Sequence, residues 1–113
     1  MRAYEFLTES KVRILYHVSK ESNRTSILAN GLEARNQEDL NIHRKPGVYL
    51  FSSLDDAREW AHWGKLTYKE PYDIWKVVLP SDYELTKDSH PEMKDFNSYV
   101  GYDTILNDTI KLL

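Results

Sequence analysis

Alternation of apolar and polar side chains marks most of the strands that this chain is expected to form. From Lys11 to Ser19 every second residue is apolar and the other face is mixed, as in a β-strand with a second, partly buried face. The apolar runs Val48–Phe51 and Ile74–Leu79 predict two further strands. Alternation returns over Ser98–Ile105, and Asp108–Leu113 is predicted to be a short terminal strand or helix.

Two helices are predicted between these strands. Ser22–Asn30 has an apolar stripe and is followed by Gly31, at the position where a glycine commonly ends a helix. Ser53 stands three residues before Asp56, a capping pattern that predicts the start of a second helix. Apolar and small residues then recur at helical spacing: Leu54, Ala57, Trp60, Ala61 and Gly64.

The remaining segments are polar. Glu33–Lys45 lacks periodicity and predicts a loop, and loops of this length are often functional. Ser81–Asn97 predicts a turn with a short helix. Because the helices fall early and the strands follow one another late, the order favours an α+β fold over a doubly wound sheet. Residues 1–10 are expected to form an N-terminal arm and residues 11–113 a single domain, since the sequence shows neither a linker nor a repeat.

Composition narrows the possible functions. The 113 residues are 41% hydrophobic and 29% charged, the balance of an ordinary folded domain. With 15 basic against 18 acidic residues the net charge is -3, so stable binding of duplex DNA is not expected. The lack of cysteine excludes thiol nucleophiles and cysteine-ligated zinc, and the four histidines lack metal-binding spacing, so no metal is expected. No apolar stretch is long enough for a membrane span and no secretory signal is evident, which predicts a cytoplasmic protein without membrane contact.

Three short segments stand out by their residues and their order. They are Leu15-Tyr16-His17-Val18-Ser19, then Gly47-Val48-Tyr49-Leu50-Phe51 followed by Ala57 and Trp60, then Asn97-Ser98-Tyr99-Val100-Gly101-Tyr102-Asp103. Together they resemble the ADP-ribosyltransferase fold of the diphtheria-toxin and poly(ADP-ribose) polymerase type, a class that includes RNA 2′-phosphotransferases. The resemblance spans residues 17–113. It implies two small antiparallel sheets with short helices around a cleft that binds NAD as a substrate.

The resemblance also implies an activity and a set of site residues. An enzyme of this class transfers ADP-ribose from NAD to a protein or nucleic-acid acceptor and releases nicotinamide. His17 takes the place of a histidine that bonds a ribose, and Ser19 is its hydroxyl neighbour. Trp60 takes the place of the ring that stacks on nicotinamide, a conservative change of aromatic surface. The other residues assigned to nucleotide binding are Val18, Arg35, Tyr49 and Ala57.

One position departs from the resemblance. The polymerase-like motif has a glutamate where this chain has Ser98, and a hydroxyl group cannot supply the charge of a carboxylate. Loss of such a preorganised group typically raises a reaction barrier by about 2–4 kcal/mol. Either the protein binds NAD or ADP-ribose without turnover, or another acid acts, or the motif has a different register. Glu59 is assigned as a catalytic acid beside His17 and Ser98, with Glu92 and Asp95 as the other candidates.

Plainer interpretations stay open. One is that His17, Tyr49 and Trp60 are ordinary core residues. In another, Ser98 marks lost catalysis, and the protein is a catalytically inactive relative that binds another protein, as an inhibitor or a virion accessory module. The RNA phosphotransferase branch is a third interpretation and requires basic residues near His17. The opening residues 1–7 are similar to the starts of some phage proteins, which suggests a phage-encoded protein that acts in the host cytoplasm.

Overall fold

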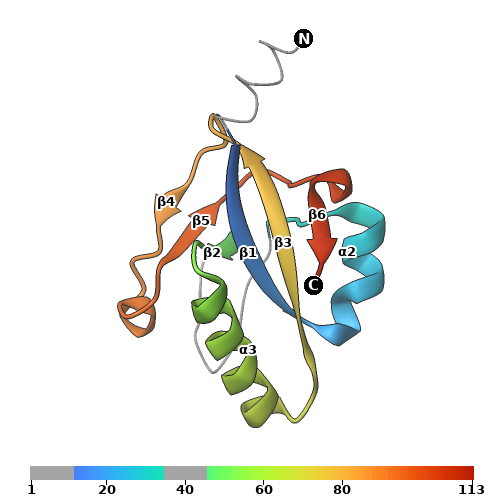
Figure 1. Cartoon of the computed structure of the whole chain (residues 1–113), viewed down its shortest axis with the longest axis vertical. Helices are drawn as coiled ribbons and strands as arrows, with labels where there is room; N and C mark the ends of the chain where they lie inside the picture. The colour runs from blue at the N-terminus through green and yellow to red at the C-terminus, as the bar shows by residue number, and fades with distance from the viewer. Residues whose placement is uncertain (1–11, 35–45) are drawn as a thin grey trace.

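One six-stranded antiparallel sheet forms the centre of the computed structural model, which describes residues 12–34 and 46–113 (Figure 1). The strand order is β4-β5-β2-β1-β3-β6, and every neighbouring pair is antiparallel. The strands are β1 (Val12–Lys20), β2 (Val48–Phe51), β3 (Tyr72–Pro80), β4 (Thr86–Lys87), β5 (Ser98–Gly101) and β6 (Ile110–Leu112). The helices of the described part are α2 (Arg24–Asn30), α3 (Leu54–Tyr68) and the 3₁₀ helices η1 (Glu21–Asn23), η2 (Pro91–Met93) and η3 (Asn107–Thr109).

The sheet narrows where β1 meets β2. β1 and β3 pair along their whole length, and β2 pairs with β5 along its whole length. Between β1 and β2, by contrast, the register holds one pair, Tyr16 opposite Phe51. The sheet therefore has two three-stranded halves, β4-β5-β2 and β1-β3-β6, that are joined at this pair. The α+β class is confirmed, but the expectation of two separate sheets is wrong, because Tyr16 and Phe51 keep the hydrogen-bonded sheet continuous.

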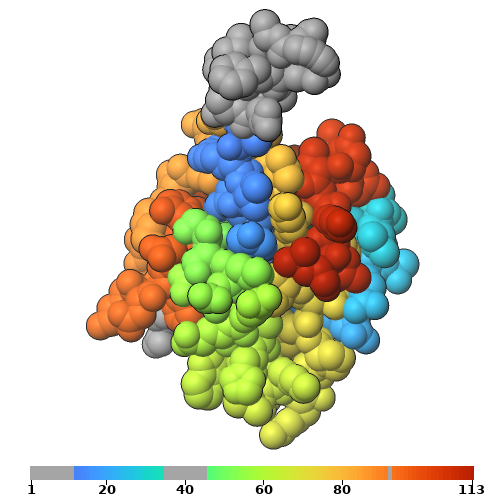
Figure 2. All heavy atoms as spheres, viewed as in Figure 1, coloured from blue at the N-terminus to red at the C-terminus, as the bar shows by residue number. Residues whose placement is uncertain are grey.

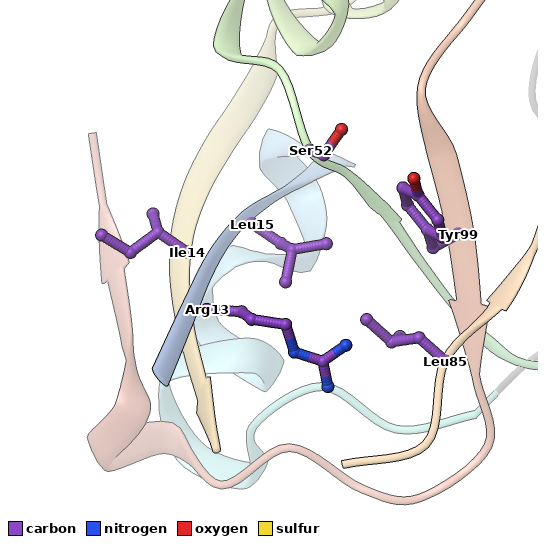
Figure 3. Close-up of a pocket in the computed structure, with 6 residues that line it drawn as sticks. All are labelled: Arg13, Ile14, Leu15, Ser52, Leu85 and Tyr99. Carbon is purple, nitrogen blue, oxygen red and sulfur yellow. The ribbon is translucent and has the colours of Figure 1, made fainter. Parts of the chain in front are cut away.

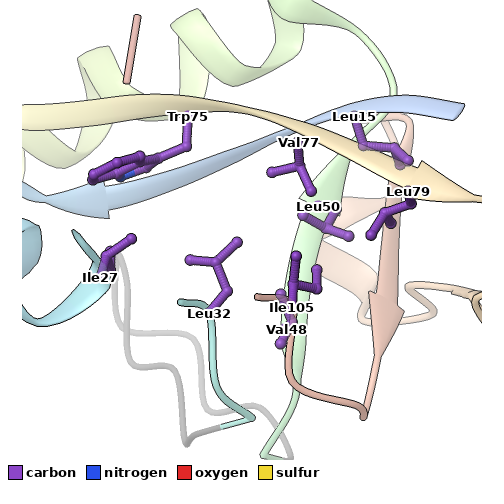
Figure 4. Close-up of a cluster of buried hydrophobic side chains, with 9 residues drawn as sticks. All are labelled: Leu15, Ile27, Leu32, Val48, Leu50, Trp75, Val77, Leu79 and Ile105. Atoms are coloured by element: carbon purple, nitrogen blue, oxygen red, sulfur yellow. The ribbon is translucent and has the colours of Figure 1, made fainter. Parts of the chain in front are cut away.

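Side chains of β1 alternate between two layers, as the period of a strand requires. Leu15 lies in the layer of α2, whose core cluster is drawn in Figure 4 and consists of Leu15, Ile27, Leu32, Val48, Leu50, Trp75, Val77, Leu79 and Ile105. Val18 lies in the layer of α3, whose core cluster consists of Val18, Phe51, Ala57, Trp60 and Met93. The sheet thus separates two apolar cores.

The start of α3 follows from its sequence, whereas its end does not. The Ser53 hydroxyl accepts a hydrogen bond of 3.3 Å from the Asp56 N–H, which confirms the capping pattern. Within the helix, Gly64 lies against the ring of Tyr72, because a Cβ there would come within 2.7 Å of that ring. The helix ends at Lys69, which has a left-handed backbone with φ of 60°.

α2 ends at Gly31, as the sequence predicts. The φ of this residue is 75°, and a Cβ would lie 2.1 Å from the carbonyl oxygen of Ile105. Both the backbone angle and the close approach therefore favour glycine. Leu32 then pairs with Ile105 in an isolated bridge, which ties the end of α2 to the chain after β5.

α3 covers only part of its side of the sheet. In Figure 2, atoms of β1 and β3 remain visible above the helix. Ile14 and Val78 lie opposite each other on these strands and are 47% and 36% exposed. The helix therefore protects the middle of the sheet and leaves the start of β1 open.

The remaining predictions of secondary structure agree in part with the observed elements. β5 ends at Gly101, earlier than the predicted strand, and the final segment contains the strand β6. β4 was not predicted, because two polar residues give no periodic signal. The predicted arm at 1–10 and most of the predicted loop Glu33–Lys45 lie outside the described residues.

Candidate functional site

The three segments that carry the resemblance are neighbouring strands. The first lies in β1, the second in β2 and the third in β5, and these strands are adjacent in the order β5-β2-β1. Phe51 connects them, because it lies opposite Tyr16 on one side and opposite Ser98 on the other. Segments that are far apart in the sequence therefore meet in one region of the sheet.

His17 lies where the β1–β2 pairing ends. Its Nδ1 is 2.8 Å from the carbonyl oxygen of Tyr49 on β2. A carbonyl oxygen can only accept, so Nδ1 carries the proton and donates. The imidazole is 6% exposed and lies in the layer of α2. A side chain therefore makes the link that a main-chain hydrogen bond would make in a longer β1–β2 pairing.

Ser19 is part of a buried polar group on the same face. Its Oγ accepts a hydrogen bond of 2.9 Å from the indole nitrogen of Trp75. Asp73, opposite Ser19 on β3, accepts two hydrogen bonds from Arg24, from Nε at 2.9 Å and from Nη2 at 2.6 Å. The hydrogen bond that Arg24 donates to Asp73 is the main cause that raises the pKa of Arg24 above its ordinary value. This pair attaches α2 to the sheet.

Trp60 lies on the opposite side of the sheet. Its indole packs against two phenylalanine rings, with centroid distances of 6.3 Å to Phe51 and 5.6 Å to Phe96. Val18 and Ala57 belong to the same core cluster. Because all three predicted residues are buried there, a ring that stacks on Trp60 has to displace side chains that now cover it.

The structure does not bring the predicted site residues around one hollow. His17 and Ser19 lie in the layer of α2, and Val18, Ala57 and Trp60 lie in the layer of α3. Tyr49 and Ser98 alternate with residues of the α2 layer and so face α3 as well. The cause is the strand period of two, which places Val18 on the reverse face from its neighbours. Arg35 lies outside the described residues.

A buried carboxylate stands beside Ser98, and sequence analysis did not propose it. Ser98 is 1% exposed and its Oγ lies 3.4 Å from Oδ2 of Asp88, which is 7% exposed. The Asp88 N–H donates to the Ser98 carbonyl oxygen at 3.0 Å, and Oδ1 accepts from the His90 N–H at 3.2 Å. An aspartate that accepts from the backbone two residues later is a turn signal. That signal locates the turn, but the pairing with Ser98 depends on β4.

The other acidic and basic candidates do not gather around Ser98 or His17. Glu59 is an exposed residue of α3, Asp95 is exposed, and the Glu92 side chain is outside the described part. Arg13 shares the face of His17 but precedes it by four residues, which is roughly 13 Å along a strand. The convergence of basic residues on His17 that a phosphotransferase site requires is therefore not provided by Arg13.

A cavity of about 370 Å³ lies at the opening between the two halves of the sheet (Figure 3). Its described lining comes from β1, from the end of β2 and from the β4–β5 region: Arg13, Ile14, Leu15, Ser52, Leu85 and Tyr99. None of these six residues was assigned to nucleotide binding.

No protein-family model, curated protein or solved structure matches the chain. The resemblance to ADP-ribosyltransferases therefore rests on the residues of the three segments alone. Across residues 12–34 and 46–113, no three metal-ligating side chains gather as a metal ion would require. In the same ranges, no helix has the length and apolar character needed to cross a membrane.

Proposed function

We propose that the protein binds NAD through an ADP-ribosyltransferase-like arrangement of β5, β2 and β1. The observation that supports this proposal is the meeting of the three motif segments at Phe51, between Tyr16 and Ser98. In a sheet of six strands the three strands that carry the motifs need not be consecutive, and here they are. The arrangement is therefore more informative than any of the motifs alone.

The nicotinamide end of NAD would bind in the layer of α3. Trp60 offers the aromatic surface there, and Ala57 offers a position without a bulky side chain. Binding requires that the segment after η2 withdraws, because Phe96 now packs edge-on against Trp60. His17 then acts as a positioning residue that holds β1 against Tyr49 of β2. Because it lies in the layer of α2, the ribose contact that the resemblance implies is not available to a nucleotide bound in the layer of α3.

Transfer of ADP-ribose would need a carboxyl group near Ser98, and the proposal assigns this role to Asp88, whose Oδ2 lies 3.4 Å from the Ser98 hydroxyl. In the reaction, the bond between the nicotinamide nitrogen and the ribose carbon breaks, and its electron pair leaves on nicotinamide. The acceptor forms the new bond to that ribose carbon. Its proton passes to the carboxylate of Asp88, which is a general base in this scheme.

A second candidate is a protein of the same fold that has no transferase activity and binds a partner. The observation that favours it is the burial of the candidate groups, since Ser98 is 1% exposed and Trp60 is covered by Phe51 and Phe96. The two candidates differ in whether NAD binds and whether it is consumed. Both can be decided with the purified protein.

The experiment is incubation with NAD, followed by chromatography for nicotinamide and by thermal denaturation. The transferase proposal expects nicotinamide release that Asp88→Asn reduces by about a hundredfold, the effect typical of a positioned base. Asp108→Asn is the matched control, because Asp108 is exposed and has no assigned catalytic role. Stabilisation by NAD without release would indicate binding alone. Neither stabilisation nor release would exclude NAD as a ligand and leave the partner-binding candidate.

A further inference from the structure

The cavity between the halves of the sheet combines an apolar interior with one charged group. Leu15, Leu85 and the ring of Tyr99 form its apolar walls (Figure 3). The guanidinium of Arg13 extends between β1 and Leu85. The volume of about 370 Å³ lies at the lower end of the range of small-molecule sites. It suits a ligand smaller than a dinucleotide.

The charge of Arg13 has no carboxylate to balance it in the part of the chain that the structure describes. Its Nη2 donates to two neutral acceptors, the carbonyl oxygens of Pro80 at 3.3 Å and Tyr83 at 2.5 Å. Its Nε is buried and has no acceptor among the described residues. Arg13 is only partly buried, but an N–H that is shielded from solvent and has no acceptor is unfavourable. An anion in the cavity would remove this cost.

A second cation lies close to the same wall. Nζ of Lys87 is 5.2 Å from the ring centroid of Tyr99 and donates to the carbonyl oxygen of Phe96 at 2.8 Å. The six lining residues include no acidic side chain, although the whole chain has a net charge of -3. The charged groups named at the cavity are therefore positive, whereas the net charge of the chain is negative, and this favours an anionic ligand at this position.

We propose that this cavity is a binding site for a small organic carboxylate with an apolar body. The carboxylate accepts from Nε of Arg13, and the body packs on Leu15, Leu85 and Tyr99. The site is distinct from the proposed NAD site, because its described lining shares no residue with that site. It does not depend on NAD binding.

The test is a titration followed by two-dimensional amide NMR spectra that include the Nε–H signal of Arg13. The probes are phenylacetate and isocaproate, each paired with its neutral amide, and acetate as an anion without an apolar body. A charge-assisted hydrogen bond should make each carboxylate bind about tenfold tighter than its amide. Signals of Arg13, Leu85 and Tyr99 should move together and saturate.

Two variants locate the site. Arg13→Gln should abolish the preference for carboxylates, whereas Arg58→Gln removes the same charge from an exposed side chain of α3 and should preserve it. Because Arg13 also holds the turn after β3, Leu85→Trp is a second variant that fills the cavity and keeps the guanidinium. Leu28→Trp is its exposed control. The proposal fails if neither carboxylate binds better than its amide, if acetate binds as tightly as phenylacetate, or if Leu85→Trp leaves binding unchanged.

Discussion

His17 on β1 and Tyr49 on β2 are joined by a hydrogen bond from an imidazole to a main-chain carbonyl, at 2.8 Å. Beyond Tyr16 and Phe51 the register between these two strands stops, so this bond extends the connection between the halves of the sheet. Its loss would remove a buried hydrogen bond between the two strands, which lowers stability. The position of His17 is therefore explained by the sheet itself, whatever ligand the protein binds.

His17→Ala should lower the free energy of unfolding by about 2 kcal/mol or more, from the lost hydrogen bond and the space left behind. His17→Asn should recover part of this loss, because the asparagine amide nitrogen can take a place close to that of Nδ1. Urea denaturation measures both, with His62→Ala as the control on an exposed position of α3. If Asn is as destabilising as Ala, the hydrogen bond is not the reason for the histidine.

The sequence predicted the elements better than their relative placement. The patterns at Ser53 and Gly31 are local, so the ends of two helices could be found from a few neighbouring residues. The face of the sheet that α3 covers is a property of the whole fold. Periodicity showed that His17 and Val18 point to opposite sides of the sheet. It could not tell which of these two residues lies on the same side as Trp60.

Asp88 shows a second limit of the sequence. Its nearness to Ser98 depends on β4, a strand of two polar residues. Such a strand forms because β5 offers an edge to pair with, and not because its own residues favour it. A candidate acid that is placed by tertiary pairing could not be found from spacing. Glu59 lies in a strongly periodic helix and was easier to place, but it is exposed.

Lys69→Gly should stabilise the protein. Lys69 ends α3 with φ of 60°, a left-handed conformation in which a side chain costs about 1–2 kcal/mol. Glycine removes this cost, but it also gives the unfolded chain more conformational entropy, which offsets part of the gain. The net increase in the free energy of unfolding should therefore be about 0.5–1 kcal/mol. Lys69→Ala removes the same charge and keeps the Cβ. An equal gain from alanine would show that charge, and not the backbone, decides.

Tyr83 should make stability depend on pH in the alkaline range. Burial, followed by the nearby charge of Asp103, raises the pKa of Tyr83 from 10.0 to about 12. The unfolded chain therefore ionises first, and stability is complete below pH 10 and falls as the pH rises toward about 12. Tyrosinate absorbance should show a late step that loses one tyrosine's share of the amplitude in Tyr83→Phe. Tyr102→Phe, at an exposed position, should leave that step in place. A late step that survives in Tyr83→Phe belongs to another residue.

Phe96→Ala should strengthen NAD binding if Trp60 is the stacking surface. Phe96 lies 5.6 Å from the Trp60 indole and 6.0 Å from Phe51, so its removal opens the layer of α3 next to the indole. The variant should be less stable without a ligand, because a partly buried ring is lost, yet NAD should raise its melting temperature more than that of the unmodified protein. Leu106→Ala, at an exposed position, controls for the loss of an apolar side chain. Destabilisation with no gain in the response to NAD would mean that Phe96 is simply part of the core and that nicotinamide does not bind beside Trp60.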